Sequence, residues 1–338
     1  MRVLIVVLGV AFVAACAGVT AGATSSGRVL ELRYPNASPL PKGSRYIKSA
    51  TQLGIDDSDL AASSSTMYVA TSQGLQRIDG ASNAILSPWL ANTDAEYIAY
   101  ADGLVWASDY DGDVVRGVDE STGAVQLTVQ LPMGSSPEGV VVADGAVWVA
   151  EHHAGAVARI DPSTGQVVAQ VTAGLTGSSG PQGIAYGAGS VWVSVPNSSE
   201  VVRIDPATNR VLAKIHVPSP MSPCGGIAIG TTSAWVTGCF DNTWVARISI
   251  ATNKVVRLID MHARSIEPVA HGDSAWFLVG PDPDLRHHAY LVQLSAADRV
   301  LHRYDLGARF TPGGTAIAFG SLWASSFATP WVARIPLG

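Results

Sequence analysis

Carboxylate and imidazole side chains that could carry out acid/base chemistry stand together at Glu151-His-His153. A carboxylate beside an imidazole can exchange protons with a substrate or bind a metal ion. Adjacent histidines on an extended strand point to opposite sides, so only one of the two can face a shared site. We predict Glu151 and His153 as a catalytic pair, the alternative being that these side chains serve only the fold.

Other polar residues fall on loops beside predicted strand ends. As ligand-binding residues we predict Glu96, Asp109, Glu138, Gln182 and Glu267. The run Asp109-Tyr-Asp-Gly-Asp113 begins like a calcium loop, but it lacks the terminal Glu and the rest of the loop spacing, which favours a tight turn. The sequence holds no Gly-x-Ser-x-Gly, His-Glu-x-x-His or Cys-x-x-Cys motif, and it assigns no metal ligand.

The candidate residues lie within a sequence repeat of short predicted strands. Residues 146–171 read as three short strands separated by two turns. The strand with the aromatic residue recurs in seven copies, at Met67-Tyr-Val69, Leu104-Val-Trp106, Val147-Trp-Val149, Val191-Trp-Val193, Ala234-Trp-Val236, Ala275-Trp-Phe277 and Leu322-Trp-Ala324. A strand of the type Val-x-Arg-Ile-Asp follows each copy, then a third strand, and a fourth opens with Pro-x-Gly-Ile-Ala.

Four strands in a repeat of roughly 40 to 45 residues are the period of a β-propeller blade. We therefore predict an all-β fold, a seven-bladed β-propeller with four antiparallel strands per blade, as one domain over residues 24–338. The Gly and Ala of Pro-x-Gly-Ile-Ala suit the innermost strand, where strands converge on the axis. The Trp of the next strand suits the gap between neighbouring blades.

The N-terminal segment is expected to close the ring. Residues 24–36 repeat the outer-strand pattern of residues 162–171, while the last blade stops after its third strand. We predict that residues 29–33 pair with residues 332–335, which leaves no unpaired edge between the first and last blades. The alternative is a loose tether, which the Pro- and Ser-rich residues 37–44 favour for their own length.

Residues 1–23 predict an export signal, because Arg2 precedes an apolar run too short to span a bilayer comfortably. Val13-Ala-Ala-Cys16 resembles the lipobox of bacterial lipoproteins, so we predict lipidation at Cys16 and a membrane attachment by this anchor alone. An ordinary signal-peptidase site at Ala21-Gly-Ala23 is the alternative and gives a secreted protein. An extracytoplasmic location follows in both cases.

The two other cysteines predict a disulfide. Cys224 precedes an inner strand and Cys239 ends the Trp235 strand, and in an antiparallel pair these two places lie side by side. The bond would enclose about 15 residues and stabilise the fold by about 3 kcal/mol on the loop-entropy model. An oxidising compartment permits it. Free thiols or a metal pair are the alternative.

Composition limits the classes of partner. Hydrophobic residues make up 47% of the chain and charged residues 14%, which suits sheets buried on both faces. The formal net charge of -6 provides no basic stripe, so nucleic acid is excluded as a partner. We expect a monomer that meets a small molecule or an extracytoplasmic protein.

The pattern Pro-x-Gly-Ile-Ala, Gly-x-Val-Trp-Val and Val-x-Arg-Ile-Asp-Pro-x-Thr-Gly resembles the YncE-like and streptogramin (virginiamycin B) lyase-like propellers. The resemblance implies a carbon–oxygen lyase that opens a cyclic depsipeptide lactone with histidines, a glutamate and Mg²⁺ at the channel mouth. It matches Glu151 to the lyase glutamate. In the lyases a catalytic His directly follows the Pro that opens an inner strand. The corresponding positions in this chain hold Glu138, Gln182 and Cys224, so His153 or His271 would have to take the role of that His.

Two hypotheses for function follow. The first is an exported propeller that binds a ligand or a protein partner at its channel-mouth face without chemistry, since scaffold residues are abundant and no complete catalytic set is present. The second is a lyase of the streptogramin type, in which Glu151 and a nearby His act as acid/base groups around Mg²⁺.

Overall fold

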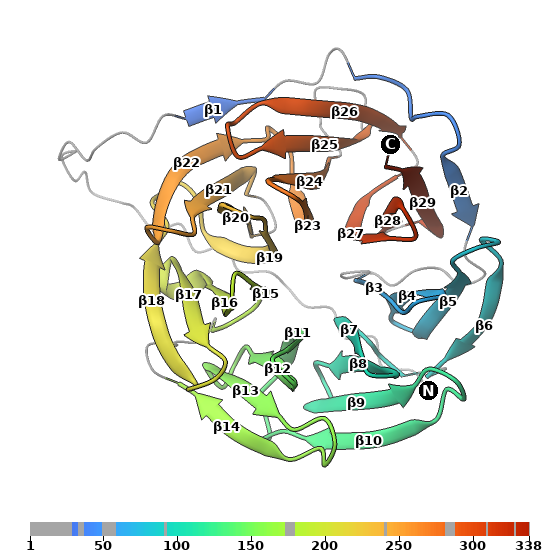
Figure 1. The fold of residues 1–338 in the computed structure, drawn as a ribbon, viewed down its shortest axis with the longest axis vertical. Helices are drawn as coiled ribbons and strands as arrows, with labels where there is room; N and C mark the ends of the chain where they lie inside the picture. The colour runs from blue at the N-terminus through green and yellow to red at the C-terminus, as the bar shows by residue number, and fades with distance from the viewer. Residues whose placement is uncertain are drawn as a thin grey trace, which may run out of the picture.

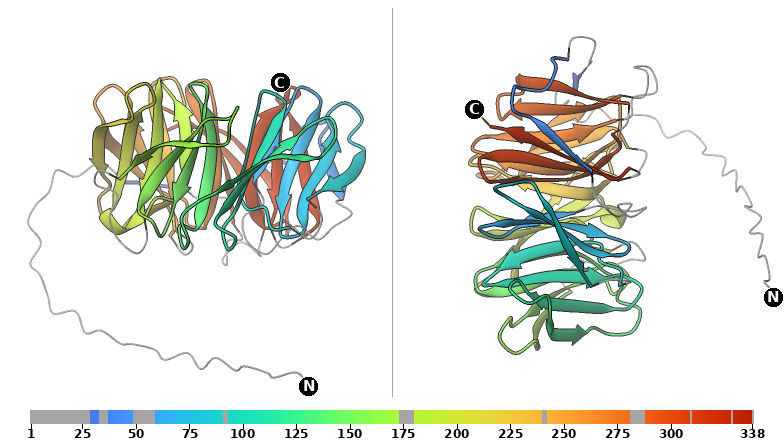
Figure 2. Two further views of the ribbon diagram at one scale, coloured as in Figure 1. Left: turned by 90° about the horizontal axis from the view of Figure 1, so that it is seen from below. Right: turned by 90° about the vertical axis from the view of Figure 1, so that its right-hand side faces the viewer.

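The computed structural model describes residues 29–32, 37–48, 59–90, 93–172, 180–239, 242–280, 288–308, 310–327 and 329–337. Seven small β-sheets stand around a central axis (Figure 1), and the side views show a flat disc (Figure 2). The predicted seven-bladed β-propeller is confirmed. The predicted export signal with Cys16 lies outside the described residues. Within the described ranges, no helix has the length and apolar character needed to cross a bilayer.

Each blade is an antiparallel sheet whose strands follow one another outward from the axis. Blades one to three are β3 (Leu60–Ala62), β4 (Thr66–Thr71), β5 (Gly74–Asp79), β6 (Ile85–Trp89); β7 (Ile98–Ala101), β8 (Leu104–Asp109), β9 (Val114–Asp119), β10 (Val125–Gln130); and β11 (Pro137–Ala143), β12 (Ala146–Glu151), β13 (Ala156–Ile160), β14 (Val167–Val171). Blades four and five are β15 (Ile184–Gly187), β16 (Ser190–Val195), β17 (Glu200–Asp205), β18 (Arg210–His216); and β19 (Pro223–Ile229), β20 (Ser233–Gly238), β21 (Trp244–Ser249), β22 (Lys254–Asp260). Blade six is β23 (Ser265–His271), β24 (Ser274–Val279), β25 (Ala289–Ser295), β26 (Val300–Gly307), and blade seven is β27 (Pro312–Ala318), β28 (Ser321–Ser326), β29 (Trp331–Pro336) with the N-terminal β2 (Arg45–Lys48). A 3-10 turn, η1 (Pro196–Ser198), follows β16.

The ring closes through β2, which pairs antiparallel with β29 so that Ile47 lies opposite Val332. An N-terminal outer strand in the last blade is therefore confirmed, but the prediction that residues 29–33 form it was wrong. Val29–Glu31 forms β1, which runs parallel to β22 at the outer edge of blade five. Alternating apolar and polar residues fit the edge of any blade, so the pattern did not specify which edge the segment joins.

The described residues between β1 and β2 are also attached to the propeller. Leu32 is 4% exposed and packs into the core between blades five and six. Ser38 forms a β-bridge with Tyr304 on β26. The described parts of residues 29–48 thus follow the outer strands of blades five, six and seven, and the loose tether considered for residues 37–44 was wrong.

The aromatic residue of each second strand fills the space between blades, as predicted. Tyr68, Trp106, Trp148, Trp192, Trp235, Trp276 and Trp323 are all at most 3% exposed. In three blades the indole N–H donates to the carbonyl five residues earlier, from Trp148 to Ala143 at 3.3 Å, from Trp192 to Gly187 at 3.1 Å and from Trp323 to Ala318 at 3.2 Å. A buried indole therefore keeps its polar atom satisfied there while its ring seals the junction.

The arginine of the third strand links one blade to the next. Cζ of Arg203 lies 4.4 Å from the centre of the Trp192 ring, and Nη1 donates to Asn253 Oδ1 in the outer turn of blade five at 2.6 Å. The same link recurs from Arg159 to Asn209 at 3.3 Å, from Arg247 to Asp298 at 2.8 Å and from Arg334 to Asn83 at 2.8 Å. The accepting residues have φ between 54° and 63°, a left-handed conformation that Asn and Asp tolerate. The link from Arg334 joins the last blade to the first.

The residues after this arginine serve the core and the turn. Ile204 is fully buried. Asp161 Oδ1 accepts hydrogen bonds from the hydroxyl group of Ser163 at 2.6 Å and from its backbone N–H at 2.8 Å, and these bonds lower the pKa of Asp161. The sequence Val-x-Arg-Ile-Asp therefore encodes an inter-blade link, a core residue and a turn cap.

The closing link predicts a specific loss of stability. Replacing Arg334 by Ala removes the guanidinium that lies 4.9 Å from the Trp323 ring and donates to Gly80 and Asn83. We expect the free energy of unfolding to fall by about 2 kcal/mol, measured by urea denaturation. Arg45→Ala is the matched control, since Arg45 is exposed and, within the described residues, donates to the nearby carbonyls of Gly43 and Ser44. Equal losses in both variants would contradict the link.

Candidate functional site

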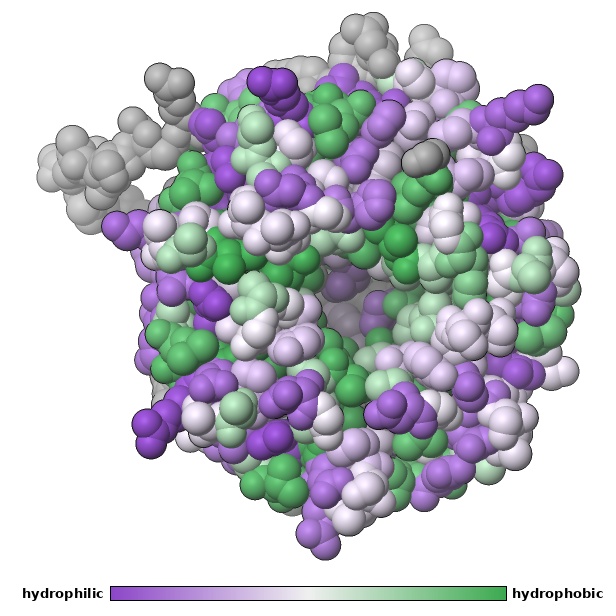
Figure 3. All heavy atoms as spheres, viewed as in Figure 1, coloured by the Kyte–Doolittle hydropathy of each residue, from purple (hydrophilic) through white to green (hydrophobic). Residues whose placement is uncertain are grey.

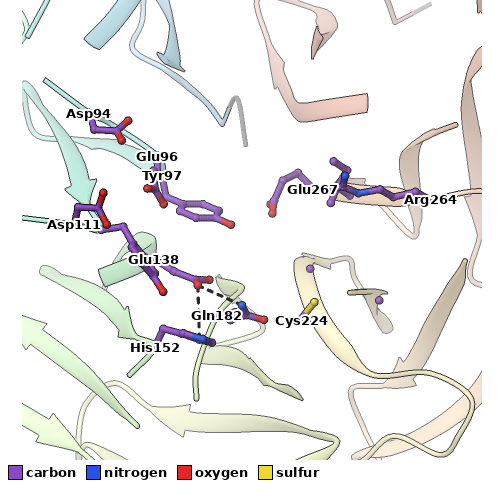
Figure 4. Close-up of a pocket in the computed structure, with 14 residues that line it drawn as sticks. Asp94, Glu96, Tyr97, Asp111, Glu138, His152, Gln182, Cys224, Arg264 and Glu267 are labelled. Atoms are coloured by element: carbon purple, nitrogen blue, oxygen red, sulfur yellow. Dashed lines mark hydrogen bonds and ion pairs between the residues drawn. The ribbon is translucent and has the colours of Figure 1, made fainter. Parts of the chain in front are cut away.

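A cavity of about 500 Å³ opens at the face where the inner strands begin. Five residues that the sequence places on the loops leading into those strands line it together: Glu96, Glu138, Gln182, Cys224 and Glu267. Asp94, Tyr97, Tyr110, Asp111, His152 and Arg264 add to its polar lining. Figure 3 shows the ring hollowed at its centre, and Figure 4 shows side chains from several blades around the opening.

β-Bulges at the start of the inner strands turn these side chains toward the cavity. The pairing of β11 with β12 shifts register between Pro137 and Val140, and β19 and β23 shift at the matching place. A bulge leaves its extra residues out of the ladder and redirects their side chains. Glu138, Cys224 and Glu267 are bulge residues and line the cavity. In Pro137-Glu-Gly139 and Pro223-Cys-Gly225, the Pro-x-Gly motif therefore places the residue x in the bulge.

Glu138 is held between two blades. Gln182 Nε2 donates to Glu138 Oε1 at 3.2 Å, and His152 Nδ1 lies 3.6 Å from the same oxygen. His152 is 7% exposed, and burial, together with the neighbouring His153, lowers the pKa of His152. The imidazole is therefore neutral at neutral pH and can act as a hydrogen-bond donor or acceptor.

Glu267 has a strained backbone. Its φ is 36°, which costs a non-glycine residue about 1 kcal/mol or more. The hydroxyl of Thr315 donates to its carbonyl, and a Cβ at Gly226 would collide with its carboxylate. Figure 4 shows Glu267 facing Tyr97 across the opening. Neighbouring blades thus hold this carboxylate in place, and strained residues of this kind gather at functional sites.

The predicted catalytic pair lies outside the cavity lining. Glu151 is fully buried at the end of β12, on the same face as Val147 and Val149, which pack against blade two. His153 is exposed, with Nδ1 3.0 Å from the Ser136 hydroxyl and Nε2 3.4 Å from that of Tyr110. The structure brings His152 to the cavity instead of His153. His152 follows the last residue of β12, where strand alternation no longer applies.

Asp109, predicted to bind ligand, serves its own turn. Its Oδ1 accepts the backbone N–H of Gly112 at 2.8 Å, and its Oδ2 forms an ion pair with Arg116 at 2.8 Å. This geometry agrees with the tight turn predicted for residues 109–113. The next two residues, Tyr110 and Asp111, line the cavity.

Sequence reasoning missed Asp94 and Tyr97, which line the cavity beside Glu96. Blade two lacks the Pro-x-Gly motif, so only their closeness to Glu96 marked them. Arg264 also lines the cavity.

The residues present do not fit the Mg²⁺ that the lyase resemblance implies. Within the described ranges, no three His, Cys, Asp or Glu side chains are grouped so that they could hold a metal ion. The acidic side chains around the cavity are spread over blades two, three and six, whereas a metal site needs its ligands within bonding distance of one point.

The predicted disulfide between Cys224 and Cys239 is present, with their Cα atoms 5.0 Å apart. Cys224 lies in the bulge of β19, and Cys239 follows the end of β20. The bond ties these two strand ends together at the cavity wall. It thereby restrains the backbone that carries Gly225 and Gly238, which also line the cavity.

Comparison with solved structures agrees with the fold. The chain is similar to a streptogramin B lyase, with a TM-score of 0.73 and 14% identity over 87% of this chain and 97% of that one. It is similar to virginiamycin B lyase from Staphylococcus aureus, with a TM-score of 0.69 and 15% identity over 87% and 99%. It is also similar to a chain of the mitotic checkpoint complex, with a TM-score of 0.71 and 13% identity over 90% and 97%.

No protein-family model and no curated protein sequence matches this chain. Identities of this size establish a shared fold and leave the site to be argued from its own residues. The resemblance to the streptogramin lyase propellers, predicted from the repeat, is therefore confirmed at the level of the fold.

Glu151 predicts a pH dependence of stability. Burial raises the pKa of Glu151 above its ordinary value, and the negative charge of Asp113 adds to the rise, while Gln170 partly opposes it. Among the described residues, neither carboxylate oxygen has a hydrogen-bond partner of good geometry. Between the unfolded and folded pKa values the native state binds more protons, so stability falls as pH rises through that window.

We expect Glu151→Gln to have a larger free energy of unfolding than the wild type at about pH 7. The substitution should also remove the part of the fall in stability that begins, as pH rises, at about pH 4. Urea denaturation across this range measures the effect. Asp102→Asn, which neutralises an exposed turn carboxylate, is the control and should follow the wild type. A Glu151→Gln profile parallel to that of the wild type would show that the burial of Glu151 has no such consequence.

Proposed function

We propose that this protein binds a small organic ligand in the channel-mouth cavity without chemistry. The observation that carries the proposal is the convergence of equivalent residues from blades two to six in one cavity of about 500 Å³. Pockets for small molecules are concave, and their volumes are roughly 300 to 1,000 Å³. A concave site of this size favours a small molecule over a flat protein partner.

The position of the catalytic candidates supports binding over reaction. Glu151 is buried between blades, and His153 is outside the cavity lining. A catalytic group must come within hydrogen-bond reach of the reacting atoms. Neither residue meets this requirement for a ligand in the cavity, whereas binding does not need them.

Filling the cavity should abolish ligand retention. Gln182 lines the cavity, and Gln182→Trp would place an indole in it. The purified protein is incubated with a mixture of metabolites, and retained compounds are identified by mass spectrometry. We expect the wild type to retain compounds that Gln182→Trp loses. Leu212→Trp, on the exposed outer strand β18, is the control and should retain them. The same retention in all three proteins would contradict the proposal.

A lyase of the streptogramin type is the second candidate. The pairing of Glu138 with His152 inside the cavity is the observation in its favour, because a carboxylate and a neutral imidazole can exchange protons with a substrate. The test is linearisation of a cyclic depsipeptide, followed by mass spectrometry. Turnover that is lost in His152→Ala would support the lyase, and turnover that survives in Glu151→Gln would exclude Glu151 as its base. No turnover by the wild type would reject this candidate.

We also propose that the protein is exported and anchored through a lipid on Cys16. The lipobox-like Val13-Ala-Ala-Cys16 and the Cys224–Cys239 disulfide support this proposal, because disulfides persist in oxidising compartments. Membrane fractionation of the full chain and of Cys16→Ser would test it. Equal distribution of both proteins between membrane and soluble fractions would reject the anchor.

A further inference from the structure

We propose that the ligand of the channel-mouth cavity is an organic cation that carries ammonium or guanidinium groups on an apolar body. This inference rests on the proposed binding function and adds the chemical class of the ligand.

The cavity holds an excess of negative charge. Five carboxylates line it, from Asp94, Glu96, Asp111, Glu138 and Glu267, and Arg264 is the guanidinium among the lining residues. These six groups give the cavity lining a formal charge of -4, and the chain as a whole has a formal net charge of -6. A concave site lined by one sign of charge attracts the opposite charge and strengthens its field through the low-dielectric walls.

A polar side chain in the wall provides a second and independent observation. His152 lines the cavity and is 7% exposed, and among the described residues its Nδ1 has no hydrogen-bond partner. Its nearest carboxylate oxygen, Glu138 Oε1, lies 3.6 Å away, beyond hydrogen-bond distance. A buried polar atom without a partner costs stability. A bound group that donates hydrogen bonds to Glu138 and His152 would supply the partner that this part of the cavity wall lacks.

The spacing of the acidic groups favours an extended organic cation over a metal ion. Figure 4 shows Glu96 and Glu138 on one side of the opening and Glu267 on the other. Within the described residues no metal-binding group of three such side chains forms. A molecule with two separated cationic ends can reach both sides, and each end can donate charge-assisted hydrogen bonds.

Aromatic residues accompany the carboxylates. Tyr97 and Tyr110 line the cavity, and the faces of aromatic rings attract cations. The pKa of Tyr110 is raised, first by burial and then by the charges of Glu138, Glu96 and Asp111. Because three carboxylates act on this one phenol, the electrostatic potential at the cavity wall around Tyr110 is negative.

Glu267 is the carboxylate that the fold is built to place. It sits in a bulge with φ of 36°, and Gly226 leaves the space that its side chain occupies. It also lines the hollow below the mouth, beside inner strands of blades one to four. Glu267 is therefore placed to meet the part of a ligand that enters deepest, and its removal should weaken binding more than the loss of a distant charge.

The test uses three five-carbon compounds that differ in the charge of their ends: pentanediamine, pentanediol and glutarate. Titration calorimetry on the purified protein should detect the diamine alone, with affinity falling as salt rises because charge attraction is screened. Glu267→Gln and Glu138→Gln should each weaken diamine binding about tenfold, which corresponds to about 1.4 kcal/mol. MgCl₂ at equal ionic strength should not displace the diamine.

Asp144→Asn is the matched control, because it removes one negative charge from an exposed turn at the other end of β11. Its affinity for the diamine should equal that of the wild type. Binding of pentanediol or glutarate as tight as that of the diamine, or equal losses in Glu267→Gln and Asp144→Asn, would overturn the inference. Circular dichroism of each variant confirms that the fold is retained.

The two proposals fail in different ways. If the compounds that the wild type retains and Gln182→Trp loses are neutral or anionic, the binding function stands and the cationic ligand is rejected. If Gln182→Trp binds the diamine as tightly as the wild type, the cavity is not the binding site and both are rejected.

Discussion

The structure depends on the contact between neighbouring blades, and the third-strand arginine is its clearest polar component. A blade is a small sheet with two apolar faces, so it is stable only when another blade covers each face. Trp rings supply the apolar seal, and Arg203 lies over one such ring while it bonds to the left-handed Asn253 of the next blade. The bond from Arg334 to Asn83 makes the same contact between the last blade and the first. The chain is therefore a closed ring of repeated junctions.

This ring also creates the cavity, since the inner strands converge at one mouth. In blades three, five and six the inner strand begins with a bulge, and the cavity-lining residue in that bulge differs between them: Glu138, Cys224 and Glu267. The scaffold fixes where these side chains lie, and the residue types fix their chemistry. A propeller can thus change its ligand by changing single residues at its channel mouth while the blades stay the same.

The sequence was sufficient for the repeat, the blade number, the disulfide and part of the cavity lining, because each depends on a local pattern. The sequence was not sufficient where contacts between distant parts of the chain decide the structure. The segment at residues 29–31 fits any outer edge, and only the packing of Leu32 between blades five and six selects β22. The choice between His152 and His153 depends on the turn after β12, which alternation does not describe. Glu151 resembled a catalytic group because the burial of its carboxylate cannot be read from its neighbours in sequence.

The path of the N-terminal segment has a consequence for biosynthesis. β1 and β2 are made before any blade, yet their partners β22 and β29 belong to blades five and seven. A ribosome delivers the chain from its beginning, so both strands must wait without a partner while the blades accumulate. The outer strand of the last blade, β2, has already been synthesised when β29 emerges from the ribosome. The closed ring is therefore the last structure that the nascent chain can form.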